Sequence, residues 1–246
     1  MDNYRKAPCY TKRAFPSPIS GRKVKEHLDL VAGQMSLADR VVWRKGVAHL
    51  KRRDPVLGRL IRAVGPIDFK VEDGHYESLV GAIVFQQLAG AAAQAILNRF
   101  MKLYDGKIPK PEEYLATDQS KLRGAGLSPQ KISYIRDLCQ RLVDGSLNLR
   151  GLADKPDNQV VEQLDAVKGI GRWTAEMFLL FVLGRTDVLP VDDLGLQKAA
   201  KRIYRLRVLP SKQRFEKLAK NWHPYSSVAT MYLWRSGEKP GDAVKW

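Results

Sequence analysis

The chain has 246 residues, which is long enough to bury a full core as one large domain or two closely packed ones. Its 42 Lys and Arg against 26 Asp and Glu give a net charge of +16, which indicates a polyanionic partner, either nucleic acid or an anionic membrane surface. Two cysteines, Cys9 and Cys139, are too few for a disulfide framework or a four-cysteine metal site and indicate a reduced intracellular compartment. Glycines and glutamines interrupt the most apolar region, Leu79–Leu97, so we expect a soluble protein without a membrane span.

Residues 1–36 are predicted to form a basic, flexible tail, because proline, glycine and basic residues occur there with little periodicity. The tail is interpreted either as a solvated extension or as a DNA-contacting arm or nuclear-targeting signal. Residues 37–246 are predicted to be the folded part of the chain.

Apolar residues at helical spacing predict helices along this folded part. Asp54 before Pro55 and Ser128 before Pro129 have the N-cap and first-turn residues typical of helix starts. The expected helices lie at 44–53, 55–61, 76–87, 91–104, 111–116, 129–142, 158–164, 172–183, 194–204, 211–221 and 226–236. A short extended piece is expected at Phe69–Asp73, but few runs alternate with period two, so the fold class is mainly α in two helical lobes.

A turn between two of these helices has the composition of a phosphate site. Lys168-Gly169-Ile170-Gly171 separates the helix that ends near residue 167 from the helix that begins at Arg172. The two glycines let the backbone approach a ligand, and the amides of Gly169, Gly171 and Arg172 point outward at a helix N-terminus, which favours an anion. An ordinary helix–helix turn is the alternative, but the flanking Lys168 and Arg172 favour a hairpin that binds DNA phosphates without reading sequence.

A carboxylate follows this hairpin in Pro190-Val191-Asp192-Asp193, at the start of the helix expected at 194–204. Taken alone, Asp192 would be a helix N-cap that stabilises the helix by ~1 kcal/mol. Its distance from the hairpin favours a second interpretation, in which a fixed acid acts on DNA held by the hairpin.

The motifs GIGRWTA, LPVDDLGLQKA and VFQQLAG occur in this chain in an order and at separations that resemble the helix-hairpin-helix DNA glycosylases. Within that superfamily the chain is most similar to the 3-methyladenine DNA glycosylase II family, the alkylation-repair branch, from about Asp54 to Trp246. The resemblance implies a helix-hairpin-helix DNA glycosylase fold with the active site in the cleft between two helical lobes. It also selects Asp192, two residues after the proline, as the catalytic acid in preference to Asp193.

The resemblance implies a monofunctional DNA glycosylase that flips out alkylated purines, such as 3-methyladenine and 7-methylguanine, and leaves an abasic site in base excision repair. An ionised Asp192 would stabilise the positive charge that develops on deoxyribose, or orient or deprotonate the attacking water. Family members that also cut the backbone carry a lysine where this chain has Trp173, and an indole cannot form a Schiff base. No cysteine follows Cys139, which excludes the iron–sulfur branch.

The family pattern also assigns a pocket and a wedge. Trp234 and Trp173 are candidate walls for a cationic base, which an aromatic ring attracts, and Met177 is a candidate lining residue; core packing is the alternative for each tryptophan. Gln87 matches the side chain that fills the gap left by the flipped base, with a polar bridge between helices as the alternative, while Gln86 is expected to be structural.

The resemblance further suggests a monovalent cation, Na⁺ or K⁺, held by the backbone carbonyls of Asp165, Val167 and Ile170. No cofactor is expected to be required. The expected partner is double-stranded DNA containing damaged bases, bound by a monomer away from membranes, in the nucleoid of a prokaryote or the nucleus of a eukaryote. Two other functions remain open: a glycosylase for oxidised, deaminated or mismatched bases, and a non-catalytic helix-hairpin-helix DNA-binding protein.

Overall fold

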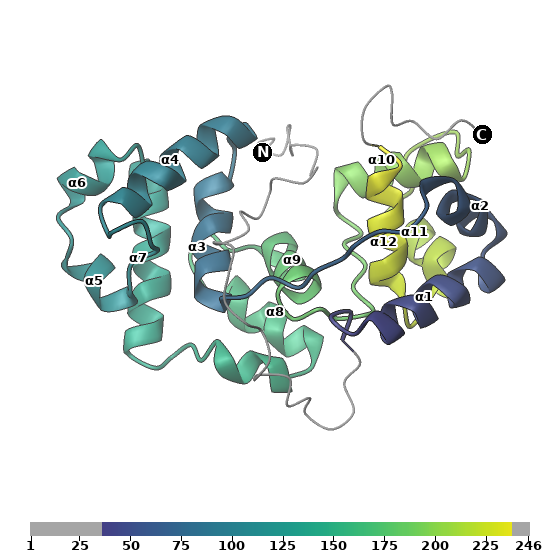
Figure 1. Ribbon diagram of the computed structural model, residues 1–246, viewed down its shortest axis with the longest axis horizontal. Coiled ribbons are helices and arrows are strands. Elements are labelled where there is room, and N and C mark those ends of the chain that lie inside the picture. The colour runs from purple at the N-terminus through teal and green to yellow at the C-terminus, as the bar shows by residue number, and fades with distance from the viewer. Residues whose placement is uncertain (1–35, 238–246) are drawn as a thin grey trace. The chain divides into compact units, whose positions relative to one another are not determined.

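The computed structural model describes residues 36–237, which are mainly helical (Figure 1). Within that range there is no strand, and the β pairing consists of one antiparallel bridge between Ser36 and Arg185. The mainly α fold class is therefore confirmed, while the extended piece expected at Phe69–Asp73 is irregular backbone. None of the helices between residues 36 and 237 has the length and apolarity needed to cross a membrane. The predicted tail, up to residue 35, lies outside the described residues.

The chain divides into two compact units, and the boundaries fall after Val71 and after Phe178. Residues 72–178 form what we call the continuous unit, and residues 36–71 with 179–237 form the discontinuous unit. Within residues 36–237 each of these units has its own buried core.

The continuous unit is organised around one long helix, α7. Its elements are α3 (His75–Phe85), α4 (Gly90–Lys102), α5 (Pro111–Ala116), α6 (Gln119–Gly124), α7 (Pro129–Val143), a 3₁₀ helix (Arg150–Asp154), α8 (Asp157–Asp165) and most of α9 (Arg172–Phe181). Helix α7 contacts α3, α5 and α6, and the expected cap is present because Ser128 Oγ accepts the Lys131 amide at 3.2 Å. Three residues of the apolar stripe on α7, Ile132, Ile135 and Leu138, are each at most 3% exposed, and Leu142 at its end is half-buried.

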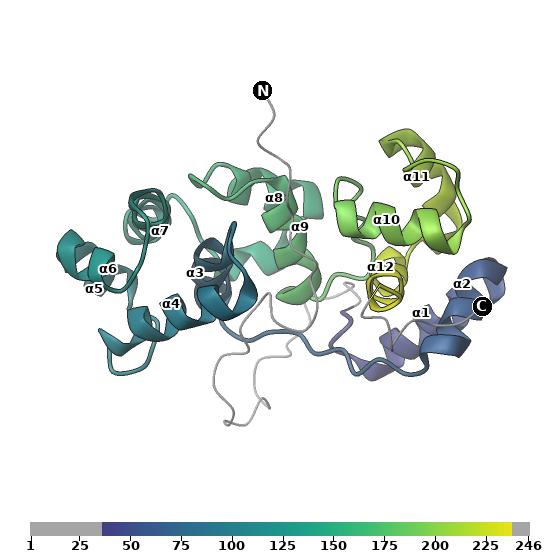
Figure 2. The same ribbon diagram turned by 90° about the horizontal axis from the view of Figure 1, so that it is seen from above.

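The discontinuous unit is organised around its last helix. Its elements are α1 (Arg40–Arg53), α2 (Pro55–Val64), the end of α9, α10 (Leu194–Ile203), α11 (Lys212–Ala219), a 3₁₀ turn (Lys220–Trp222) and α12 (Ser226–Arg235). Helix α12 contacts α1, α2 and α10, as Figures 1 and 2 both show. Gly46 lets α1 approach the start of α12 closely, because a β-carbon there would lie 2.9 Å from both Tyr225 and Val228. Helix α12 thus packs against α1 near its start and also contacts α10.

Candidate active site

The predicted hairpin joins α8, which ends at Asp165, to α9, which begins at Arg172. Gly169 has a φ of 82°, and a β-carbon there would lie 2.0 Å from Cδ2 of Tyr134. A side chain cannot occupy that position, so Gly169 is required for packing against α7 as well as for the turn. Gly171 is exposed, and a β-carbon there would come no closer than 4.0 Å to Asp165 Oδ1. The open side of the hairpin, where a phosphate can approach, is therefore the Gly171 side.

Some of the groups on the hairpin that could bind a phosphate already form hydrogen bonds or ion pairs within the continuous unit. The Lys168 amide donates to Asp137 Oδ2 at 2.9 Å, so this amide is already used, although the Lys168 side chain is exposed. Burial opposes ionisation of Asp137, but the Lys168 amide and the paired Arg141 outweigh it and lower the pKa of Asp137. The Arg172 guanidinium pairs with Glu176 Oε1 at 3.0 Å. Of the predicted phosphate contacts, the Lys168 ammonium and the amides at Gly171 and Arg172 best fit an anion.

The candidate wedge lies in the turn that follows α3. Gln87 is exposed and has a left-handed backbone with φ of 58°, an uncommon conformation that for a non-glycine residue often marks a functional position. The neighbouring Gln86 is half-buried, and its Nε2 donates to the Gly169 carbonyl at 2.8 Å. Lys131 also braces this turn, because its Nζ donates to the Val84 carbonyl at 2.7 Å. The structural role expected for Gln86 is thus a direct link between the wedge turn and the hairpin.

The two aspartates before α10 have different environments, and the capping role considered for Asp192 belongs to its neighbour. Asp193, not Asp192, is the N-cap: its Oδ1 accepts the Leu196 amide at 2.5 Å. The same oxygen accepts the indole N–H of Trp234 at 3.0 Å, and Asp193 is 6% exposed. Asp192 is exposed, and its carboxylate accepts no hydrogen bond from any residue between 36 and 237. Trp234, the predicted pocket tryptophan, is therefore hydrogen-bonded to Asp193, the second carboxylate of the pair.

A glycine lies directly beside this pair of groups. A β-carbon at Gly195, within the first turn of α10, would lie 3.2 Å from Asp193 Oδ1 and 4.0 Å from Trp234 Nε1. The missing side chain thus leaves space next to both the carboxylate and the indole. The turn before the helix is held by Gln197, whose Nε2 donates to the Val191 carbonyl at 2.7 Å.

Behind Trp234 lies a row of aromatic rings that the sequence analysis did not identify. Trp234 and Phe181 stack with ring centroids 6.1 Å apart and planes 13° apart. Phe181 stacks in turn on Phe69 at 6.2 Å, and Phe69 on Trp43 at 5.3 Å. These residues come from α1, the segment between α2 and α3, α9 and α12, so their grouping arises from folding and has no periodic signal in the sequence. The row fixes the plane of the Trp234 indole.

The other two predicted pocket residues lie on α9 within the continuous unit. Trp173 is half-buried in the first turn of that helix, and Met177 one turn later is fully buried. Full burial means that Met177 takes part in core packing in this structure.

The hairpin carbonyls predicted to hold a cation differ in their hydrogen bonds. The Val167 carbonyl accepts the Ile170 amide at 3.0 Å, whereas within residues 36–237 no backbone amide of the turn donates to the carbonyls of Asp165 or Ile170. Carbonyl oxygens at the end of a helix are suitable ligands for a hard cation. In the described part of the chain no group of three or more His, Cys, Asp or Glu side chains could hold a metal ion.

The fold and these sites define an all-helical protein with a helix-hairpin-helix element and an anchored carboxylate beside a tryptophan, and comparison with known proteins identifies its class. A family model described as "HhH-GPD superfamily base excision DNA repair protein" matches residues 80–224. The chain is 34% identical over 199 residues to DNA-3-methyladenine glycosylase 1 of Schizosaccharomyces pombe, covering 79% of this chain and 87% of that protein.

Solved structures agree with this comparison. The S. pombe 3-methyladenine DNA glycosylase Mag1 in complex with abasic DNA is similar with a TM-score of 0.72 and 33% identity, over 82% of this chain and 100% of that one. A DNA-3-methyladenine glycosidase from Bacillus halodurans is similar with a TM-score of 0.74 and 36% identity, over 85% of this chain and 96% of that one. The chain belongs to the HhH-GPD superfamily of base excision DNA repair proteins.

Proposed function

We propose that this protein is a monofunctional DNA glycosylase that removes alkylated purines such as 3-methyladenine and 7-methylguanine from double-stranded DNA, leaving an abasic site for base excision repair. The observation that carries the proposal is the hydrogen bond from Trp234 to Asp193, which fixes a partly exposed indole beside the start of α10, where Asp192 presents an exposed carboxylate. Relatives named for 3-methyladenine glycosylase activity support the choice of substrate. The protein acts as a monomer, in the compartment that holds the cell's DNA.

The reaction is a hydrolysis at the deoxyribose C1′ carbon. The bond from C1′ to the base nitrogen breaks with its electron pair on the base, which leaves as a neutral molecule because alkylation had given it a positive charge. Water then forms a bond to C1′ and loses a proton. A carboxylate beside C1′ stabilises the positive charge on the sugar and receives this proton. The Trp234 indole attracts the cationic base ring before it leaves.

We assign the acid to Asp192, as the family pattern implies, and a positioning role to Asp193. Asp193 is 6% exposed and its Oδ1 accepts the Leu196 amide and the Trp234 indole N–H, so it holds the start of α10 and the pocket indole in place. Asp192 precedes this cap and is exposed, and its carboxylate accepts no hydrogen bond from any residue between 36 and 237, so it is accessible to C1′ of a bound nucleotide.

The remaining residues bind and prepare the DNA. The hairpin holds a phosphate through its amides and Lys168, with Na⁺ or K⁺ on the carbonyls of Asp165, Val167 and Ile170 as a structural ion. Gln87 fills the space that the flipped nucleotide vacates. Trp173, in place of the lysine that lyases use, leaves the hydrolysis without a subsequent cut of the backbone.

The test follows base release and strand cleavage separately. Duplex DNA containing 7-methylguanine should lose its damaged base to the protein, and the strand should break only after hot alkali. Failure of the folded protein to release a base from any alkylated DNA would overturn the proposal. Strand breakage without alkali would instead contradict the monofunctional assignment, and release of oxidised or mismatched bases alone would favour the other glycosylase class.

A further inference from the structure

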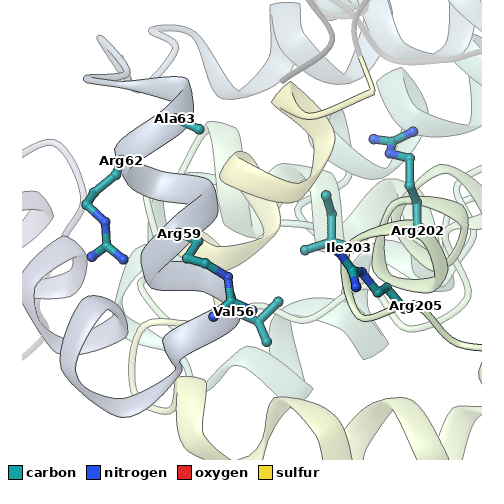
Figure 3. Close-up of a pocket in the computed structure, with 7 residues that line it drawn as sticks. All are labelled: Val56, Arg59, Arg62, Ala63, Arg202, Ile203 and Arg205. Atoms are coloured by element: carbon teal, nitrogen blue, oxygen red, sulfur yellow. The ribbon is translucent and has the colours of Figure 1, made fainter. Parts of the chain in front are cut away.

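A cavity of about 520 Å³ lies in the discontinuous unit between α2 and the C-terminal end of α10 (Figure 3). It is lined by Val56, Arg59, Arg62, Ala63, Arg202, Ile203 and Arg205. Four of these seven side chains are arginines and none is acidic. The lining therefore consists of a small apolar floor and a strongly basic rim.

Two of the arginines are placed to act on a ligand in this cavity. The side chains of Arg59 and Arg205 are exposed and make no ion pair or hydrogen bond with any residue in the described range. Arg202 is engaged, because its Nη2 donates to the carbonyl and the hydroxyl of Ser236 at 2.6 and 2.8 Å. Arg62 extends outward from α2 on the side away from α10 (Figure 3).

The walls of the cavity are locked together by a buried aspartate. Asp54, 7% exposed, caps α2 by accepting the Val56 and Leu57 amides. Its second oxygen accepts the Tyr204 hydroxyl and the Trp222 indole N–H, so it ties the start of α2 to the residue that precedes Arg205. The spacing between the two basic walls is therefore set by the core of the unit.

Arg205 also occupies a position where glycine is the usual residue. It follows the C-cap Tyr204 with φ of 52°, and the Leu206 amide closes the turn on the Lys201 carbonyl at 2.8 Å. This left-handed position at a helix end strains any residue with a β-carbon. Glycine would satisfy the fold better, so the presence of arginine suggests a role for its side chain outside the fold.

We propose that this cavity binds backbone phosphates of DNA at a distance from the nucleotide being repaired. Guanidinium groups match phosphate geometry, and the cavity has no aromatic ring or acidic group to recognise a base or a sugar. The ten residues of α10 separate Asp193 from the cavity by about 15 Å, which corresponds to about four nucleotides along a strand. The phosphates belong either to the flank of the repaired duplex or to a second duplex. This inference rests on the proposed function in that it requires DNA binding.

The decisive comparison uses a double variant, Arg59→Ala with Arg205→Gly. A matched control, Arg44→Ala with Arg214→Ala, removes the same charge from exposed positions of the same unit outside the cavity. Each protein is titrated at several salt concentrations with two abasic-analogue duplexes, one of about 30 base pairs and one with about three base pairs on each side of the site, closed by a hairpin loop. A second arm measures whether two short duplexes with different fluorophores bind one protein molecule together.

For a flank contact, the double variant should lose about tenfold in affinity for the long duplex, with the slope of log affinity against log salt reduced by about two, and keep its affinity for the short one. For a second duplex, co-binding of the two short duplexes should disappear instead. Equal losses on both duplexes without loss of co-binding, no loss in either arm, or the same losses in the control variant would each overturn the inference.

Two further readouts separate this inference from other causes. The double variant should release 7-methylguanine from the short duplex at the wild-type rate, so absence of release by the wild type would count against the proposed function and not against the cavity. Arg205→Gly alone should have an unchanged or higher melting temperature, because it relieves the strained backbone. A clearly lower melting temperature would mean that Arg205 serves the fold.

Discussion

The two adjacent carboxylates before α10 should differ sharply in their effect on catalysis. A unit negative charge about 4 Å from the developing sugar cation contributes about 4 kcal/mol at an effective dielectric constant of about 20, which applies to charge pairs near a protein surface, such as Asp192 and a bound sugar. That energy corresponds to about a thousandfold in rate. Asp193 is bound to the helix start and to Trp234, and at about twice the distance its charge contributes about 2 kcal/mol, or about thirtyfold.

Asparagine makes this comparison clean, because it keeps the shape of the side chain and removes the charge. In Asp193→Asn the amide oxygen can still accept the Leu196 amide and the Trp234 indole, and asparagine is as good an N-cap as aspartate. Its stability should therefore stay within about 0.5 kcal/mol of the wild type. Asp193→Ala should in contrast lose about 1 kcal/mol or more, because it removes the cap and leaves the indole N–H without its acceptor.

The assay is single-turnover release of 7-methylguanine from duplex DNA, with melting temperatures measured on the same preparations. We expect Asp192→Asn to be slower by about a thousandfold and Asp193→Asn by no more than about thirtyfold, with DNA binding retained in both. An inactive Asp193→Asn beside an active Asp192→Asn would refute the reasoning and assign the acid to the capping residue. Equal, small losses in both would show that neither carboxylate stabilises the sugar.

Three other changes test separate parts of the structure. Gly195→Ala should keep or raise stability, since alanine favours helices by up to about 1 kcal/mol, yet slow base release because its β-carbon would lie 3.2 Å from the Asp193 carboxylate; an unchanged rate would show that this space is not used. Gln86→Leu should raise the KM for DNA by about two- to tenfold with little change in the single-turnover rate, because it removes the bond to the Gly169 carbonyl; an unchanged KM would rule out this coupling. Burial raises the pKa of Glu72 to about 7 despite a hydrogen bond from a serine, so the native state holds this proton more tightly than the unfolded state, and stability is lost as pH rises from about 4.5 to 7. Urea unfolding of Glu72→Gln should thus show a gain of up to about 3 kcal/mol at pH 8 and none at pH 4, whereas equal effects at both pH values would contradict the burial of this group.

Local signals in the sequence were sufficient for most of the helices, although they predicted neither α6 nor the 3₁₀ helix between α7 and α8. Asp54 and Ser128 cap helices as predicted, because an N-cap depends on a side chain reaching its own backbone two or three residues away. The hairpin glycines lie where they were expected, and Gln87 is exposed in the turn after α3. The structure separates the tasks of the two glycines, since Gly169 packs on Tyr134, a contact between residues 35 apart in the chain.

Long-range contacts decide what the sequence left open. Both aspartates satisfy the spacing from the hairpin, and the residue that distinguishes them is Trp234, 41 residues further along the chain. The aromatic row reaches Trp234 through Phe69, which lies in a stretch without helical or strand periodicity. Periodicity and composition describe neighbours along the chain, so neither could bring such residues together.

Gly195 bears on how the pocket tryptophan is held. Glycine within a helix is less stable than alanine by up to about 1 kcal/mol, and the φ of Gly195 lies outside the left-handed region that would require glycine. The space that it leaves adjoins the Asp193 carboxylate and the Trp234 indole, so a β-carbon there would crowd the hydrogen bond that positions the indole. Asp192 is exposed before the helix begins and would keep its surroundings. Loss of base release in a stable Gly195→Ala protein would therefore show that the Trp234–Asp193 pair positions the base for Asp192.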